Sequence, residues 1–198
     1  MTNPDSTSDQ AKSCAERWKE LNDWLDLWFQ PEKAEAHDFA AAERELFDSL
    51  APAWLAAATG ADKIATLDAV AEQFGRERVL ALLERICGDE TRSYWAGLVR
   101  EEGSSLDDFI RLLWGPLPEL GFEFSRKQHE NGIQFCVTTC PQHQLAVDMG
   151  DSTASWLLHM VCATDPFADE SVDPPVRFLR TKTLMQGNDC CDHAYFVD

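Results

Sequence analysis

The chain has 198 residues, 44% of them hydrophobic, which is enough to bury a core and excludes an intrinsically disordered protein. Its 35 acidic and 17 basic residues give a formal net charge of −18, which argues against binding nucleic acid or an anionic membrane surface. The chain shows no apolar run of ~20 residues and no secretion signal, so we expect a cytoplasmic protein.

The polar residues 1–8 are predicted to be a disordered tail, and residues 9–114 a helical subdomain. Apolar residues recur at spacings of three and four in the first helix, which is expected to end before Pro31. Asp38 is expected to cap the next helix, and Pro52 to occupy the first position of the one after it.

Further along this half, glycine and serine mark the expected helix ends. Gly75 and Gly88 are each expected to stop a helix, and Asp89 to cap a separate helix after Gly88. Ser104 or Ser105 is predicted to cap the last helix before residue 115.

From residue 115 the pattern changes from helical periodicity to alternation. Residues 122–127 and 133–139 alternate apolar and polar side chains, and Asn131-Gly132 between them is typical of a hairpin turn. Pro141 favours the first position of a helix, which would make Cys140 its N-cap and Gly150 its end.

The remainder is expected to hold one more helix, a loop and a second pair of strands. Asp151 or Ser152 is predicted to cap the helix, and 164–175 reads as an acidic, proline-bearing loop. Residues 176–185 and 191–197 read as strands. The fold class is therefore α+β: a helical N-terminal half, then a ββααββ antiparallel-sheet domain over residues 115–198.

Five of the seven cysteines lie after residue 130, so any chemical site is expected there. Cys140 is the sharpest candidate, because free N–H groups and the helix dipole at an N-cap lower a thiol pKa. It would then be a nucleophile or a metal ligand. The alternative is a cysteine that merely fills space at a strand–helix junction.

Two spacings suggest a zinc site as a further alternative. Cys140 and His143 form C-x-x-H, and His159 and Cys162 form H-x-x-C, so each pair would share one face of a helix. The competing interpretation is that His159 and Cys162 belong to a helix packed on the sheet.

The last strand carries adjacent cysteines whose side chains must point in opposite directions. In an extended strand Cys191 and His193 share one face, whereas Cys190 and Asp192 share the other. Only Cys191 and His193 are therefore expected to reach a site that also contains Cys140 or Cys162.

Two charged residues complete the candidates. Asp165 is a candidate general base or orienting group, although Asp before Pro is also common at the start of a loop. Arg180 is a candidate clamp for a carboxylate; the alternative is that Arg180 and Lys182 are two solvated charges.

Several short motifs in this half occur in a fixed order. They are Cys140-Pro141, Gly150, Cys162 to Asp165, Arg180-Thr181 to Thr183, Gly187 and Cys191-Asp192. In this combination residues 105–198 resemble the L-2-amino-thiazoline-4-carboxylic acid hydrolase family. His193 departs from the pattern, where many relatives carry an aromatic residue, and His143 and His159 lie outside it.

The resemblance implies a hydrolase that opens a cyclic amidine ring of a small carboxylate at a C–N bond. Cys140, Asp165, Cys162 and Cys191 would be catalytic, with Arg180 and His193 binding the substrate. A set of zinc ligands made of Cys140, Cys162, Cys191 and His193 is the alternative to thiol catalysis.

The Gly-x-x-Cys motif at Gly187 to Cys190 also resembles the ending of 4-vinyl reductase domains. This second resemblance leaves a non-catalytic module that binds a small ligand or zinc as the alternative function. The Trp-rich first helix also leaves a homodimer among the expectations.

Overall fold

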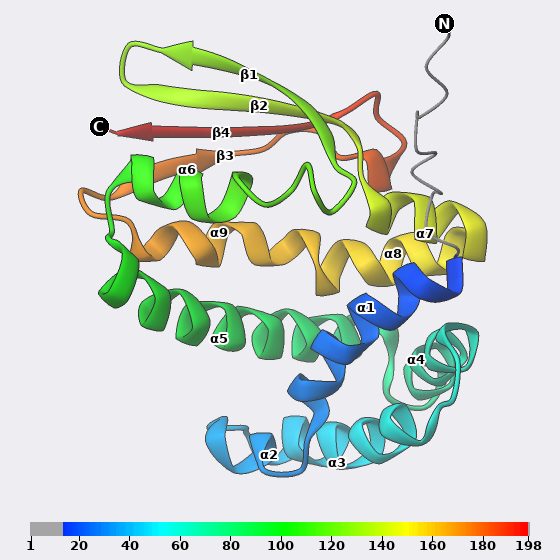
Figure 1. The fold of residues 1–198 in the computed structure, drawn as a ribbon. Helices are drawn as coiled ribbons and strands as arrows, with labels where there is room; N and C mark the ends of the chain where they lie inside the picture. Colours follow the sequence, from blue (N-terminus) through cyan, green and yellow to red (C-terminus); the bar gives the residue numbers. More distant parts are fainter. Residues whose placement is uncertain (1–13, 198) are drawn as a thin grey trace, which may run out of the picture.

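The computed structural model describes residues 14–197, and the predicted tail at 1–8 lies outside them. A four-stranded sheet forms one outer layer (Figure 1). Beneath it lie α6 and the run from α7 to α9, then the long helix α5, and α2 to α4 lie farthest from the sheet. The class is α+β, as predicted.

The first half is helical, with a 3-10 turn at Leu27–Phe29 after the first helix. The predicted end before Pro31 and the stop at Gly75 are both confirmed. Ser105 caps α6, and its hydroxyl accepts a hydrogen bond from the Asp108 N–H at 3.1 Å. The helices are α1 (Cys14–Asp26), α2 (Lys33–Ala36), α3 (Ala41–Ala56), α4 (Gly60–Phe74), α5 (Arg76–Glu102) and α6 (Leu106–Trp114).

The predicted helix starts at Asp38 and Pro52 are wrong. Helix α3 begins after Ala40, whose N–H donates to the Glu43 carboxylate at 2.8 Å, and it runs on through Pro52. A proline inside a helix costs about 3 kcal/mol. Five buried residues on one face outweigh that cost here: Leu46, Phe47, Leu50, Ala51 and Trp54.

The predicted break at Gly88 and the cap at Asp89 are also wrong. Helix α5 continues through both residues. Gly88 is buried, and a Cβ at this position would lie 2.8 Å from Cε2 of Phe167. The glycine therefore makes room for a ring instead of ending the helix.

The second half follows the predicted ββααββ order. The hairpin turn confirms the Asn131-Gly132 signal, with His129 paired to Gly132. All pairings are antiparallel, in the order β1-β2-β4-β3. The main elements are β1 (Glu123–His129), β2 (Gly132–Thr139), α7 (Pro141–Met149), α8 (Asp151–Met160), α9 (Asp165–Ala168), β3 (Val176–Leu179) and β4 (Cys191–Val197).

Two predicted boundaries in this half need correction. The expected loop at 164–175 contains α9 and a 3-10 turn at Asp169–Ser171, and another 3-10 turn at Cys162–Thr164 leads into it. The expected strand at 176–185 ends at Leu179, and a 3-10 turn follows at Leu184–Gln186. Gly150, and not Asp151 or Ser152, precedes α8 as its cap.

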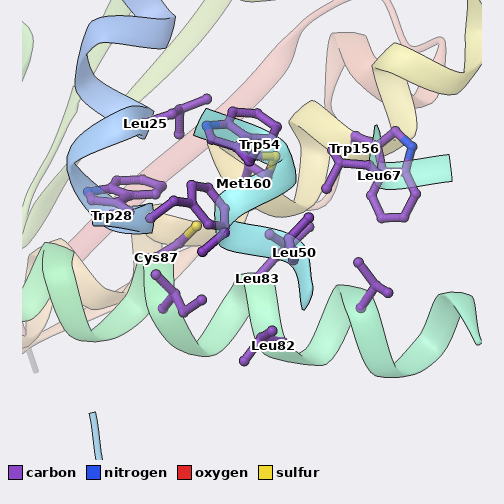
Figure 2. Packing of buried hydrophobic residues seen from close by; sticks show 14 of the residues in the cluster. Leu25, Trp28, Leu50, Trp54, Leu67, Leu82, Leu83, Cys87, Trp156 and Met160 are labelled. Carbon is purple, nitrogen blue, oxygen red and sulfur yellow. The ribbon is translucent and has the colours of Figure 1, made fainter. Parts of the chain in front are cut away.

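Two clusters of buried side chains hold these layers together. The larger cluster joins α1, α3, α4 and α5 to α7 and α8. In Figure 2 Met160 of α8 is drawn next to Trp54 of α3, and Trp156 of α8 next to Leu67 of α4. The smaller cluster lies between the sheet and α5, α6 and α9. Within residues 14–197 no helix is long and apolar enough to cross a membrane.

The larger cluster crosses the predicted subdomain boundary at residue 114. Leu145, Ala146 and Leu157 from the second half are each at most 2% exposed within it. The two halves are thus built around shared apolar packing, and the division into subdomains stays a prediction.

Candidate functional site

A cavity of about 870 Å³ lies between the inner face of the sheet and the helices beneath it. All six candidate residues contribute to its lining, although only two of them, Cys191 and His193, come from the same element. The six residues are Cys140, Cys162, Asp165, Arg180, Cys191 and His193.

Strand β4 supplies one wall of this cavity. Cys191, His193 and Tyr195 alternate with outward residues and are all buried. They pair across the sheet with Val137, Phe135 and Ile133 of β2. The predicted division of the strand is thereby confirmed, because Cys191 faces the cavity whereas Cys190 interacts with Cys136 on the other side.

Cys140 is the N-cap of α7 and Pro141 is the first helical residue, as predicted. The predicted lowering of its pKa is wrong: burial raises the pKa of the Cys140 thiol to about 11, although backbone N–H groups of Gln142 and His143 act in the opposite direction. The thiol is therefore neutral, and it donates to the Gln142 side-chain oxygen at 3.1 Å.

Asp165, Arg180 and His193 form a polar cluster on the same wall. The carboxylate of Asp165 is paired with Nη1 of Arg180 and lies 3.0 Å from Nε2 of His193. All three side chains are largely buried, with 25%, 14% and 11% of their surfaces exposed. Burial of this kind favours paired charges, so the alternative of a solvated Arg180 is wrong.

The guanidinium group of Arg180 uses only some of its hydrogen-bond donors. Its Nη1 also donates to the Cys162 carbonyl at 2.8 Å. Within residues 14–197 its Nε and Nη2 have no hydrogen-bond partner, so two of the three guanidinium nitrogens are available to a ligand.

The chain after Arg180 is held against β4 by the Asp192 side chain, besides one backbone hydrogen bond from the Asp192 N–H to the Lys182 carbonyl at 3.3 Å. The Asp192 carboxylate accepts the N–H groups of Thr181 at 2.8 Å and of Lys182 at 2.5 Å. These bonds lower the pKa of Asp192 even though burial alone would raise it. Asp192, on the outer face of β4, thus fixes the segment that carries Arg180.

The other two cysteines of the cavity are neutral thiols. Burial raises the pKa of Cys162 well above its ordinary value, and nearby Asp165 adds to the effect. Burial also raises the pKa of Cys191, whose sulfur accepts the N–H of Leu184 at 3.1 Å. Cys191 therefore secures the turn that precedes β4.

Three residues weighed from the sequence do not join this cluster. His159 contacts Glu84, Lys182 pairs with Asp189 at 3.3 Å, and His143 does not line the cavity. In the described part of the chain no three His, Cys, Asp or Glu side chains are arranged to hold a metal ion, so the zinc prediction gains no support.

Sequence patterns missed the apolar part of the lining. Trp28, Trp95 and Trp114 border the cavity, and Trp114 stacks on Phe135 with ring centroids 3.8 Å apart. Residue spacing along a helix does not show which buried residue borders a void. His193 Nδ1 is buried without a hydrogen-bond partner among the described residues.

A family model described as L-2-amino-thiazoline-4-carboxylic acid hydrolase matches residues 54–195, well over half of the chain. The match includes every candidate site residue and extends far into the helical half, beyond the region from residue 105 where motifs were found. No curated protein matches the chain, and no solved structure does.

Proposed function

The chain belongs to the L-2-amino-thiazoline-4-carboxylic acid hydrolase family, and from this premise we propose that it hydrolyses the ring of a small thiazoline-type cyclic amidine carboxylate at a C–N bond. The observation that carries the proposal is that three features line one cavity. They are the thiol of Cys140 at the start of α7, the Asp165–His193 pair, and Arg180.

In this proposal Arg180 binds the carboxylate of the substrate. Its Nε and Nη2 donors are unused, and Asp165 and the Cys162 carbonyl fix its position through Nη1. A planar guanidinium can present two parallel N–H groups to a carboxylate, which orients the ring as well as binding it.

Cys140 is the nucleophile and its proton must be removed, because a thiol with a pKa of about 11 carries almost no thiolate at neutral pH. The Asp165–His193 pair supplies the base. When His193 donates from Nε2 to Asp165, its Nδ1 keeps a lone pair, and Nδ1 has no partner among the described residues.

The reaction then proceeds in two steps. Sγ adds to the amidine carbon, and the ring C–N bond breaks as the ring nitrogen takes a proton and leaves as an amine. Water next attacks the same carbon and expels Sγ, so that the water oxygen becomes a carbonyl oxygen and the thiol is restored. Cys162 and Cys191 line the site as neutral thiols.

The test is the hydrolysis of 2-aminothiazoline-4-carboxylate and related cyclic amidines by purified protein. Cys140→Ser and His193→Gln should each lose at least about 100-fold in kcat/KM, because nucleophilic and general-base contributions are of this size or larger. Cys136→Ser is the matched control, because Cys136 is partly buried but lies outside the cavity. Equal activity of wild type and Cys140→Ser would refute the thiol mechanism.

One observation favours the alternative, a ligand-binding module. All three cavity thiols have raised pKa values, which suits binding better than nucleophilic attack. Saturable binding of cyclic carboxylates with no turnover of any of them would support the module. Zinc at one equivalent in protein purified without added metal would support a zinc-bearing form of it.

A further inference from the structure

The cavity is much larger than the ring that the proposed reaction requires. Its volume is about 870 Å³, whereas an apolar cavity of about 150 Å³ already holds a benzene molecule. Pockets of roughly 300–1,000 Å³ hold drug-sized ligands. A thiazoline carboxylate bound at Arg180 would leave most of this space empty.

The chemistry of the lining divides the cavity into two parts. The reactive and charged groups described above lie on the wall formed by β4, the segment that follows β3, the start of α7 and the turn that leads into α9. The wall formed by α5, α6 and the turn after α6 is apolar and includes Trp95, Leu98, Leu113 and Leu117; we call it the apolar chamber. Lys33 and Glu90, which also border the cavity, neutralise each other at 2.6 Å.

Apolar side chains are exposed at the rim of the same cavity. Trp24, Leu27, Tyr94 and Leu120 line it and are 42%, 57%, 64% and 53% exposed. Among the described residues only two other large apolar side chains are exposed to this degree. Exposed apolar groups gathered at one cavity are typical of a binding surface.

The rim and chamber are also rich in aromatic rings. Trp24 meets Trp28 at a centroid distance of 4.1 Å and 64°, and Tyr94 meets Trp95 at 6.0 Å and 86°. A further ring placed between these pairs would gain edge or offset contacts as well as apolar burial.

We propose that the natural ligand is an amphiphilic carboxylate with a large aromatic body. Its polar head binds at Arg180, and its body fills the apolar chamber out to the rim. Only one part of this substrate class rests on the proposed function, namely the reactive ring in the polar head. The size and apolar character of the body follow from the chamber itself.

The first test measures binding without chemistry, by calorimetry with 1-naphthylacetate and acetate as inert probes. Naphthylacetate should bind at least tenfold more tightly than acetate. Leu120→Ala should weaken naphthylacetate binding about three- to tenfold, since it removes exposed apolar contact area. Val147→Ala, on α7 and outside the cavity, should leave naphthylacetate binding unchanged, although Val147 is 60% exposed and Leu120 53%. Equal affinity for the two probes would overturn the proposal.

The second test measures turnover of 2-anilino- against 2-amino-thiazoline-4-carboxylate. A higher kcat/KM for the anilino compound supports the substrate class. Efficient turnover of the amino compound alone refutes the substrate class but is consistent with the proposed hydrolase function.

Tight naphthylacetate binding with no turnover of either compound refutes the hydrolase function but still supports a ligand with an apolar body. If Leu120→Ala changes the sedimentation coefficient and not probe binding, the rim is a protein interface and the proposal fails.

Discussion

At the scale of single residues, burial decides the state of the candidate groups. Cys140 has the N-cap position and the backbone donors that lower a thiol pKa, yet desolvation is the larger effect and the pKa rises to about 11. The start of α7 therefore does not by itself produce a thiolate at Cys140, and another group must remove the proton. In the proposed mechanism this is the task of the Asp165–His193 pair.

The protonation of Cys140 is testable by alkylation. Because its pKa is about 11, the rate of reaction with iodoacetamide should rise about tenfold per pH unit and still be rising between pH 9 and pH 10.5. Peptide mapping by mass spectrometry separates Cys140 from the other thiols. A plateau below pH 8 would contradict the raised pKa.

Asp169 gives a second prediction at this scale. Burial raises its pKa to about 7 from 3.8. The folded chain therefore holds this proton more tightly than the unfolded chain does. The contribution of Asp169 to the free energy of unfolding is largest below about pH 4 and is lost as the pH rises to 7. Asp169→Asn should be more stable than wild type at pH 8, by on the order of 2 kcal/mol.

Urea denaturation between pH 5 and pH 8 measures this difference, which should shrink steadily toward pH 5. A difference that stays constant over this range would show that ionisation of Asp169 is not its cause.

At the scale of elements, a buried helix face outweighs a single residue that usually interrupts helices. Helix α5 passes through Gly88, and α3 passes through Pro52, because each presents a row of side chains to the core. Local signals were reliable where no such packing opposes them, as at Gly75 and Ser105. Beyond the end of β3 at Leu179, the Asp192 carboxylate binds the N–H groups of Thr181 and Lys182.

The role of Gly88 can be separated from helix propensity by comparison with Gly97 in the same helix. Gly88→Leu should destabilise the protein by about 1–3 kcal/mol, because its side chain would collide with the Phe167 ring. Gly97→Ala meets no atom within 4 Å and should stabilise it by about 0.5–1 kcal/mol. Thermal unfolding measures both, and a stabilising Gly88→Leu would contradict the packing argument.

At the scale of the whole molecule, the helical layers and the sheet domain depend on each other. The larger cluster draws Leu145, Trp156 and Met160 of the second half into contact with α1 to α5. The smaller cluster places Trp95 of α5 and Phe109 of α6 against the sheet. The cavity lies between these layers, so its lining needs both halves of the chain.

This dependence predicts that a fragment of residues 115–198 does not fold alone. Removal of α1 to α6 would expose Trp156, Leu157 and Met160, each fully buried in the full chain. The fragment should unfold without a cooperative transition by circular dichroism, whereas the full chain should show a single one. A sharp transition in the fragment would instead support the division at residue 114.

The sequence by itself determined the features that depend on near neighbours. These were the α+β class, the hairpin at Asn131-Gly132, the N-cap position of Cys140 and the division of β4 into two faces, together with the motifs of the family. Each follows from capping, turn conformation or strand alternation, which involve residues only a few positions apart.

Only the tertiary structure decided the features that depend on burial and distant contacts. Continuity of α3 and α5, the neutral state of Cys140, the pairing of Asp165 with Arg180 and the apolar chamber all arise where separate elements meet. Desolvation and packing are properties of the assembled layers, and residue spacing along the chain does not encode which side chains border a void.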